Sequence, residues 1–452
     1  MSAEKKKTDQ ETKLKLFEME NTSYIFIPFS FGDSDRFRPL VGALKESDHW
    51  IQILDKVKYM HRFVAGKLDY SNEETCQCFH FRLNDSYRSE YGLPDDGTWC
   101  TMRYKKAMYR FIIRDVQLFL FTTTIGIIAF RITLEETDPF RISDAQYYLK
   151  KVSRQPFELG SPDNKSNMLD ISKNLMDGFA DVCSCDFFYY SCPGEERANL
   201  LSFTPAEPKE DFSKELFFLR RCYGEGYRYV KDAGQEQEEL LSPSDDVHWG
   251  ISPEAAACIV CPEASGRSSF ISGTLFKNFN SQYLLMYVLL LHQKYALYLF
   301  QTKMGTSDRT NLTRLEEYRS KLYEFEADFV FSYITEVPQY QLLYEKMTAA
   351  FALRKMFEDV HEPLTSLGEV RRQAEEKEQE KRDRSLENAL IMITMLSIFS
   401  AWVDSYDFFG EFLKEMLGAG EVAVRAVQLL CFALVIAIGI YVLYTQRKIK
   451  RK

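Results

Sequence analysis

Histidine is scarce in this chain, and the local motifs of common enzymes are absent. Six histidines are scattered over 452 residues. We find no Walker-type loop, no Gly-x-Gly-x-x-Gly after a strand, no His-Glu-x-x-His and no nucleophile elbow. An excess of basic charge is also absent. The formal net charge is −9, and no predicted domain has a dominant basic face apart from the C-terminal tail. We therefore expect neither an enzyme nor a protein that binds nucleic acid directly.

The N-terminus lacks an apolar stretch. Residues 1–15 are polar and rich in lysine and contain no apolar core of the kind a cleavable signal peptide requires, so we expect none. We expect residues 1–20 to be disordered.

Cysteine is present ten times, and we expect free thiols rather than disulfides if, as argued below, these residues lie in the cytoplasm. Three short spacings suggest metal binding: Cys76-Gln-Cys78, Cys183-Ser-Cys185 and Cys258-Ile-Val-Cys261. Alternation would place Cys76, Cys78 and His80 on one face of a strand, which a zinc site could use. The alternative is that these cysteines are small buried residues of core strands. Apart from this candidate and a regulatory or transported Mg²⁺ or other divalent cation, we expect no cofactor.

Two apolar segments, residues 389–409 and 426–444, predict transmembrane helices. At a rise of about 1.5 Å per residue the second covers roughly 28 Å, close to a hydrocarbon core of about 30 Å, and Gln428 is its only strongly polar side chain. The uncharged part of the first covers only about 22 Å. To cross, this segment must include Asp404 and Asp407. We expect both at the outer interface or facing protein or water, because an aspartate facing lipid costs roughly 2.5 to 3.5 kcal/mol.

Basic residues flank the two segments on the same side. Three precede the first segment (Lys381, Arg382, Arg384) and five follow the second (Arg447, Lys448, Lys450, Arg451, Lys452). The positive-inside rule then predicts a multi-pass protein of the inner (plasma) membrane with both termini in the cytoplasm and only the connection, 410–425, outside. The basic tail, 445–452, would contact anionic lipid head groups or surround a pore mouth.

The residues before the spans predict a large cytoplasmic α+β part. Strand signals occur at 23–30, 76–83, 186–191, 199–204 and 257–261, and the apolar stretch 109–133, with Gly126 near its middle, predicts successive antiparallel strands. Residues 142–182 look helical, with polar breaks around Gly160 to Lys165, and 234–246 look like an acidic loop. We therefore expect an α/β domain over 21–270 with an antiparallel or mixed sheet.

Long helices are predicted from 271 to 388, as a bundle and a stalk. Residues 283–300 are apolar enough to rival the two spans, but His292, Gln293 and Lys294 would lie in mid-membrane, so we predict a buried helix.

Two further helices are predicted at 309–331 and 339–360, with breaks at Pro338 and Pro363. A helix of mixed charge, 364–388, then runs directly into the first span. Such a stalk can transmit a cytoplasmic rearrangement to the bilayer.

This order resembles the CorA family of divalent-cation channels and transporters. The resemblance rests on a cytoplasmic α/β domain, a helical stalk continuous with the first span, a short outer connection, a second span and a basic tail. Asn388 at the start of the first span and Thr-Met-Leu-Ser-Ile-Phe at 394–399 add to it. The resemblance implies a homopentameric funnel in which the first helices line the pore and the second helices surround them.

The residues of the first span agree with a pore lining. Thr394, Ser397, Ala401 and Asp404 follow spacings of three, four and three, so they share one helix face, with Ser400 close beside it. Together with Asn388 they are the candidate pore-lining residues, and Asp407 and Glu411 are the candidate outer mouth. The alternative is that the hydroxyls bond their own i−4 carbonyls or allow close packing.

The chain also departs from the family. The Gly-Met-Asn signature is missing, since residues 406–412 read Tyr-Asp-Phe-Phe-Gly-Glu-Phe, so magnesium selectivity does not follow from the resemblance. Three functions stay open: a cation channel or transporter gated through the stalk, a ligand-gated membrane effector of the same architecture, and a non-conducting scaffold. The effector would respond to a small molecule or nucleotide messenger, as in CRISPR-linked antiviral defence.

Overall fold

The computed structural model describes most of the chain: residues 20–54, 57–68, 76–104, 107–262, 269–306, 312–418 and 420–449. It divides into two compact units, 1–365 and 366–452. The long helices after residue 270 belong largely to the first unit, so no division between units falls near that residue. The N-terminal part is an α/β domain, as predicted, and the C-terminal region is helical.

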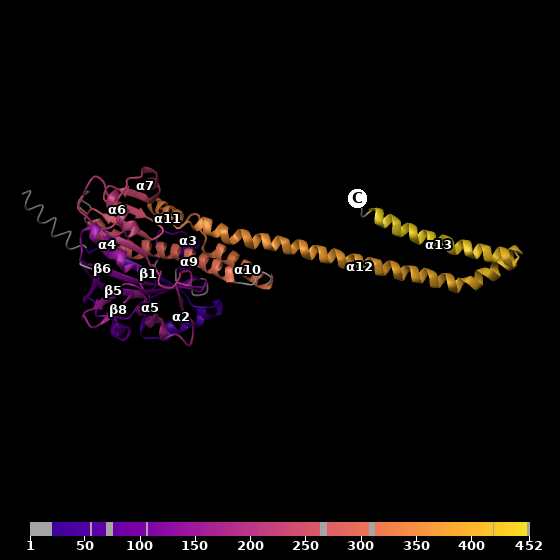
Figure 1. Cartoon of the computed structure of the whole chain (residues 1–452), viewed down its shortest axis with the longest axis horizontal. Coiled ribbons are helices and arrows are strands. Elements are labelled where there is room, and N and C mark those ends of the chain that lie inside the picture. Colours follow the sequence, from indigo (N-terminus) through magenta and orange to yellow (C-terminus); the bar gives the residue numbers. More distant parts are fainter. Residues whose placement is uncertain are drawn as a thin grey trace, which may run out of the picture. The chain divides into compact units, whose positions relative to one another are not determined.

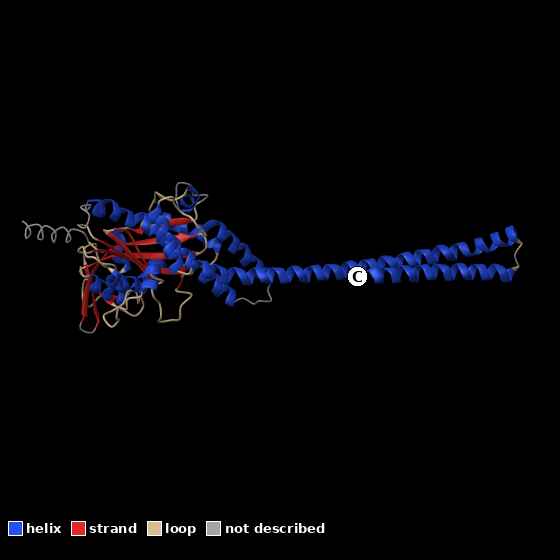
Figure 2. Ribbon diagram, turned by 90° about the horizontal axis from the view of Figure 1, so that it is seen from above, coloured by secondary structure: helices blue, strands red, loops and turns tan. Residues whose placement is uncertain are grey.

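Thirteen strands in the described residues form one mixed sheet, drawn in red in Figure 2. The main path has the order β11-β12-β13-β10-β1-β6-β5-β4-β7-β8. Off this path, β3 pairs with β5, β2 pairs with β3, and β9 pairs with β1. Strands β10 and β13 run parallel, and β1 runs antiparallel to β6 and β10. The strands are β1 Thr22–Ser30, β2 Trp50–Gln52, β3 Cys78–Leu83, β4 Trp99–Tyr104, β5 Ala107–Phe121, β6 Ile125–Leu134, β7 Phe157–Leu159, β8 Lys165–Ser166, β9 Asp186–Phe187, β10 Asn199–Pro205, β11 Leu240–Ser244, β12 Val247–Ile251 and β13 Ala255–Val260.

The helices flank and follow this sheet. They are α2 Phe37–Glu46, α3 Arg62–Leu68, α4 Pro139–Leu149, α5 Met168–Asp177, α6 Ser213–Arg221, α7 Ala233–Glu239, α8 Phe276–Asn278, α9 Leu284–Thr306, α10 Leu312–Phe329, α11 Pro338–Ala350, α12 Leu353–Leu417 and α13 Glu421–Ile449. Short 3₁₀ turns lie at Ser34–Arg36 and Asp85–Tyr91, and π-helical turns at Phe270–Leu275 and Phe279–Tyr283.

The sheet lies between two layers of helices because β1 is apolar on both faces. Ile25 and Ile27 belong to the core that also contains residues of α2, α4, α5 and α6. The alternate side chains face the other layer, where Phe26 contacts Tyr287 of α9, with ring centroids 5.2 Å apart. A strand buried on both faces needs no polar alternation. The first predicted strand is thereby confirmed.

The apolar stretch 109–133 forms the hairpin of β5 and β6, which confirms the predicted antiparallel strands. Gly126 does not make the turn. It lies inside β6, where a Cβ atom would be 2.2 Å from the ring of Phe29. A β-bulge between Ile113 and Asp115 shifts the register, and Asp115 pairs with Arg131 at 2.5 Å.

Helix α9 is a buried helix of the first unit, as predicted, and packs on β6. His292, at its centre, is fully buried and lies 2.6 Å from the Thr123 hydroxyl in the β5–β6 turn. Burial lowers the pKa of this histidine well below its usual range. The neighbouring Gln293 and Lys294 donate to the backbone carbonyls of Phe329 and Pro253, at 2.5 and 3.2 Å, whereas the buried Nδ1 of His292 has no hydrogen-bond partner among the described residues.

Several local predictions are wrong. Strand β7 lies inside the stretch 142–182 predicted to be helical, and the predicted helix 339–360 is divided between α11 and α12. The segment 234–246 is not a loop, because α7 begins after the N-cap Asp232, whose side chain accepts from the backbone N–H of Gly234 and Gln235, and β11 follows directly. Pro363 does not end a helix, contrary to the prediction from its residue type, but lies inside α12. Val360 and Leu364 beside it are buried, and this packing offsets the lost backbone hydrogen bond.

Candidate functional site

The candidate site lies in the second unit, where α12 ends and α13 returns beside it (Figure 1). The two helices leave only Gly418 to Gly420 between them, so most of the predicted connection 410–425 is helical. Gly418 has a φ of +61°, a left-handed conformation that glycine adopts without strain and that commonly ends a helix. The segment predicted as the first span is helical throughout.

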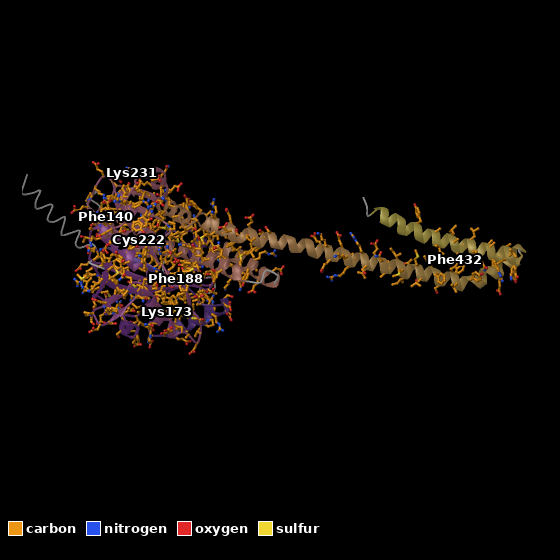
Figure 3. All side chains as sticks on the ribbon, in the orientation of Figure 1. Phe140, Lys173, Phe188, Cys222, Lys231 and Phe432 are labelled. Carbon is orange, nitrogen blue, oxygen red and sulfur yellow. The ribbon has the colours of Figure 1, made fainter. Side chains whose placement is uncertain are left out.

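Aromatic side chains join the two helices. Phe432 of α13, labelled in Figure 3, lies with its ring centroid 4.6 Å from that of Trp402 and 6.0 Å from that of Phe399, both on α12. Trp402 also meets the Tyr406 ring edge-on at 5.3 Å. Such offset and tilted ring pairs add to the apolar contact between the helices.

A polar contact continues the same seam. The side-chain Nε2 of Gln428 donates to the backbone carbonyl of Tyr406 at 2.9 Å, and Gln428 is 7% exposed. The glutamine can approach because Gly410 has no side chain there: a Cβ atom would lie 3.0 Å from Gln428 Nε2. The one strongly polar residue of the second apolar segment is therefore a link between helices rather than a residue exposed to lipid.

Gln428→Leu should weaken the packing of α13 on α12, the helical hairpin of the second unit. Hydrogen bonds between membrane helices contribute about 0.6 kcal/mol on average and at most about 1.7, so backbone amides around 424–432 should exchange hydrogen roughly 3- to 20-fold faster. Hydrogen–deuterium exchange of the detergent-solubilised chain measures this. Leu429→Ile, at a position that is 68% exposed, is the matched control and should leave the exchange unchanged. Equal exchange in Gln428→Leu and wild type would mean that the contact carries no stability.

The outer surface of the hairpin is apolar. One described helical stretch, Glu376–Val403, is long and apolar enough to cross a membrane, with a mean hydropathy of 1.6 in its most apolar window and none of that window buried. The second predicted segment, 426–444, lies in α13 and is not among the stretches that meet this criterion over the described residues. Large apolar side chains are nevertheless exposed on both helices: Leu390, Met392, Ile393, Leu396 and Val403 on α12, and Val422, Leu429, Leu430, Leu434 and Ile436 on α13.

The predicted polar face of α12 lies away from α13. With roughly 100° of rotation per residue, Ser397 is on the opposite side of the helix from Trp402 and Tyr406. Ala401 and Thr394 lie toward the edge of that side, Thr394 only about 80° from Trp402. The two hydroxyls donate to their own helix, Thr394 to the Leu390 carbonyl at 2.8 Å and Ser397 to the Ile393 carbonyl at 2.9 Å. This is the backbone bonding weighed as the alternative, and it leaves each hydroxyl oxygen able to accept.

The other candidate residues of this region are placed less fully. Asn388, Ser400 and Glu411 are exposed on α12. Asp404 and Asp407 lie in α12, and Arg447 and Lys448 lie in the last turn of α13, but their side chains are outside the description. Lys450, Arg451 and Lys452 are outside the described residues.

The cysteine–histidine candidate is engaged in other contacts. The Cys76 thiol donates to the Cys78 carbonyl at 2.8 Å. His80 Nε2 lies 3.0 Å from Gln117 Oε1, and its ring stacks on Phe119 with centroids 4.1 Å apart. Across the described ranges, no three His, Cys, Asp or Glu side chains come together as a metal site. The structure supports the alternative interpretation, a core strand.

Two cavities in the first unit could hold a ligand. One, of about 430 Å³, lies beside the β5–β6 turn and is lined in part by Arg38, Thr123 and Lys303. The other, of about 620 Å³, adjoins the first turns of α12 and is lined in part by Leu353 and Phe357. Sequence reasoning missed both, because their walls come from segments far apart in the chain.

Comparisons with known proteins identify no relative of this chain. No protein-family model matches the chain, and searches of curated proteins and of solved structures find no match either.

Proposed function

We propose that the protein is a membrane cation channel or transporter of CorA-like architecture, with two spans, both termini in the cytoplasm and the first helices of a homopentamer around a central pore. The observation that carries the proposal is the two-sided character of α12. One side contacts α13 through Phe432 and Gln428, and the opposite side carries Ser397, with Ala401 and Thr394 toward its edge. An inner helix needs a small polar side toward a wet pore and an apolar side toward the outer helix.

The exposed apolar side chains support the membrane part of the proposal. Helices with large apolar residues around most of their surface are stable only where lipid or neighbouring helices cover that surface. Lipid covers the outside of the proposed ring of α13 helices, and neighbouring copies cover the flanks of α12. Rings of Asp404, Asp407 and Glu411 at the outer mouth would concentrate cations.

Flux measurements test the proposal. In liposomes containing the purified protein we expect cation flux, assayed with magnesium, other divalent cations and sodium in turn. Ser397→Leu should lower it on the order of tenfold by placing an apolar side chain in the pore, and Asp404→Asn should change the cation preference. Met392→Leu, on the side of α12 away from Ser397, is the matched control and should conduct as wild type does.

The outcomes separate the alternatives. Flux that neither Ser397→Leu nor Asp404→Asn alters would place the pore elsewhere. If the substitutions change the assembly and neither the variants nor the wild type conduct, the non-conducting scaffold is favoured.

A ligand-gated effector is the second candidate, and the 620 Å³ cavity favours it. Leu353, Arg354 and Phe357 of the first turns of α12 line this cavity, and α12 runs on to Leu417. A small molecule bound there would contact the helix that contains the first span. Flux that appears only when such a ligand is added, and that Leu353→Trp abolishes by filling the cavity, is the result expected of this version.

A further inference from the structure

Two cysteines lie side by side in the turn between α5 and β9. Cys183 and Cys185 are separated by a single residue, and their sulfur atoms are 3.7 Å apart. Cys183 is buried and Cys185 is half-buried. A disulfide has a sulfur–sulfur distance of about 2.05 Å, so a movement of less than about 2 Å would join the pair.

The surroundings shift the pKa values of the two thiols in opposite directions. A hydrogen bond from Cys185 lowers the pKa of Cys183, and the positive charge of Arg36 acts in the same direction, against the effect of burial. The same hydrogen bond raises the pKa of Cys185. Cys183 is therefore the thiol that ionises first, and the thiolate is the nucleophilic form of cysteine.

We propose that Cys183 and Cys185 form a redox-active pair that a hydroperoxide converts reversibly into an intramolecular disulfide. The Cys183 thiolate attacks the peroxide oxygen, the O–O bond breaks, and the departing oxygen leaves as water after taking a proton. The Cys185 thiol then attacks the sulfur of the Cys183 sulfenic acid, and a second water leaves. Two thiols and one hydrogen peroxide thus give one disulfide and two waters, and a small dithiol reverses the change.

Metal binding is the weaker interpretation of the pair. Soft cations held by thiolates usually have three or four protein ligands, and no His, Asp, Glu or further Cys in the described chain completes such a set here. A disulfide across one residue closes a small, strained ring, and strained disulfides are the labile, easily reduced ones. This suits a reducing cytoplasm, where disulfides are usually transient.

The pair is well placed to affect the fold around it. Cys185 directly precedes β9, whose Phe187 pairs with Phe29 of β1. A few residues later, beyond Phe188 (labelled in Figure 3), the Tyr190 ring stacks on Tyr295 of α9, with centroids 5.2 Å apart. Closing the disulfide would therefore pull on a segment that connects the central strand to the α9 layer.

Differential alkylation of the full-length, detergent-solubilised protein tests the proposal. After treatment with hydrogen peroxide and unfolding in denaturant, Cys183 and Cys185 should both resist maleimide, on a peptide two hydrogen atoms lighter, and dithiothreitol should restore both. Cys192, which is exposed, is the internal comparison and should not enter this disulfide. Cys192→Ser should leave the oxidation of the pair unchanged.

A second variant keeps the test decisive. Cys185→Ser removes the resolving thiol, so Cys183 should accumulate as a sulfenic acid that dimedone labels, while a thermal melt confirms that the variant is folded. Complete alkylation of Cys183 at peroxide concentrations that oxidise Cys192 would overturn the proposal. So would protection of the pair without the loss of two hydrogens, or a disulfide that joins either thiol to another cysteine.

Discussion

In the Gly126→Ala variant we expect the free energy of unfolding of the sheet-containing unit to fall by about 3 kcal/mol or more. The alanine Cβ would lie 2.2 Å from Cζ of Phe29 and within 2.6 Å of two further ring atoms. Phe29 is fully buried, and its ring also lies 5.1 Å from that of Phe187, so it has no free space to enter. Denaturant unfolding of the full chain, followed by the circular dichroism of the sheet, measures the effect.

Two further variants make this result interpretable. Gly42→Ala, in α2, adds a methyl group that meets nothing within 4 Å and should stabilise slightly, by about 0.5 to 1 kcal/mol, because alanine favours the helix. Combining Gly126→Ala with Phe29→Leu should restore part of the loss, since the smaller side chain vacates the space. Wild-type stability in Gly126→Ala alone would show that the ring of Phe29 does not lie over this glycine.

Elements with a strong local signal could be predicted from the sequence. Strand β1, the β5–β6 hairpin and the buried helix α9 follow from apolar runs whose lengths and residue types decide between helix and strand. Their arrangement could not be predicted. Strand β1 lies between β6 and β10, which are far from it in sequence, and β10 pairs in parallel with β13. No periodic pattern specifies which distant strand becomes a neighbour.

Tertiary contacts explain the local errors. Helix α7 is short and polar, and its end is held by Lys346 of α11, whose Nζ donates to the carbonyls of Gln237 and Glu238 at 2.6 and 3.1 Å. Glu239 also pairs with Arg221 at 2.8 Å. A composition rich in glutamate and glutamine does not reveal these distant partners, so the sequence alone indicates a loop.

Part of the candidate site was visible in the sequence. The polar face of the predicted first span follows from spacing alone, and Gln428 stood out as the polar residue of the second segment. The partner of Gln428 could not be inferred, because it is a backbone carbonyl that the glycine at 410 leaves accessible. The cysteine–histidine pattern at 76–80 shows the opposite case, in which alternation on a strand suggested a metal site and the structure shows core packing.

On the proposed two-span topology, Leu396→Lys should disrupt membrane insertion of α12. Leu396 is 67% exposed and lies within the stretch long enough to span a bilayer, and a lysine at the centre of a span costs about 3 kcal/mol. The readout is labelling, from outside intact cells, of a Gly420→Cys variant with a membrane-impermeant maleimide. Gly420 lies between α12 and α13, and a side chain there meets nothing within 4 Å. We expect Leu396→Lys to lower this labelling several-fold.

The matched control is Leu386→Lys, which makes the same substitution at a site of similar exposure, 69%, ten residues earlier. There the new charge joins the basic residues that precede the span and favours the cytoplasmic side, so labelling at position 420 should stay at the level of the parent variant. If both lysine variants label equally well, residue 396 does not lie at depth in the hydrocarbon, and the two-span topology is wrong. If neither variant nor the parent labels, the connection between the helices does not reach the outer surface, and the hairpin must instead be covered by protein.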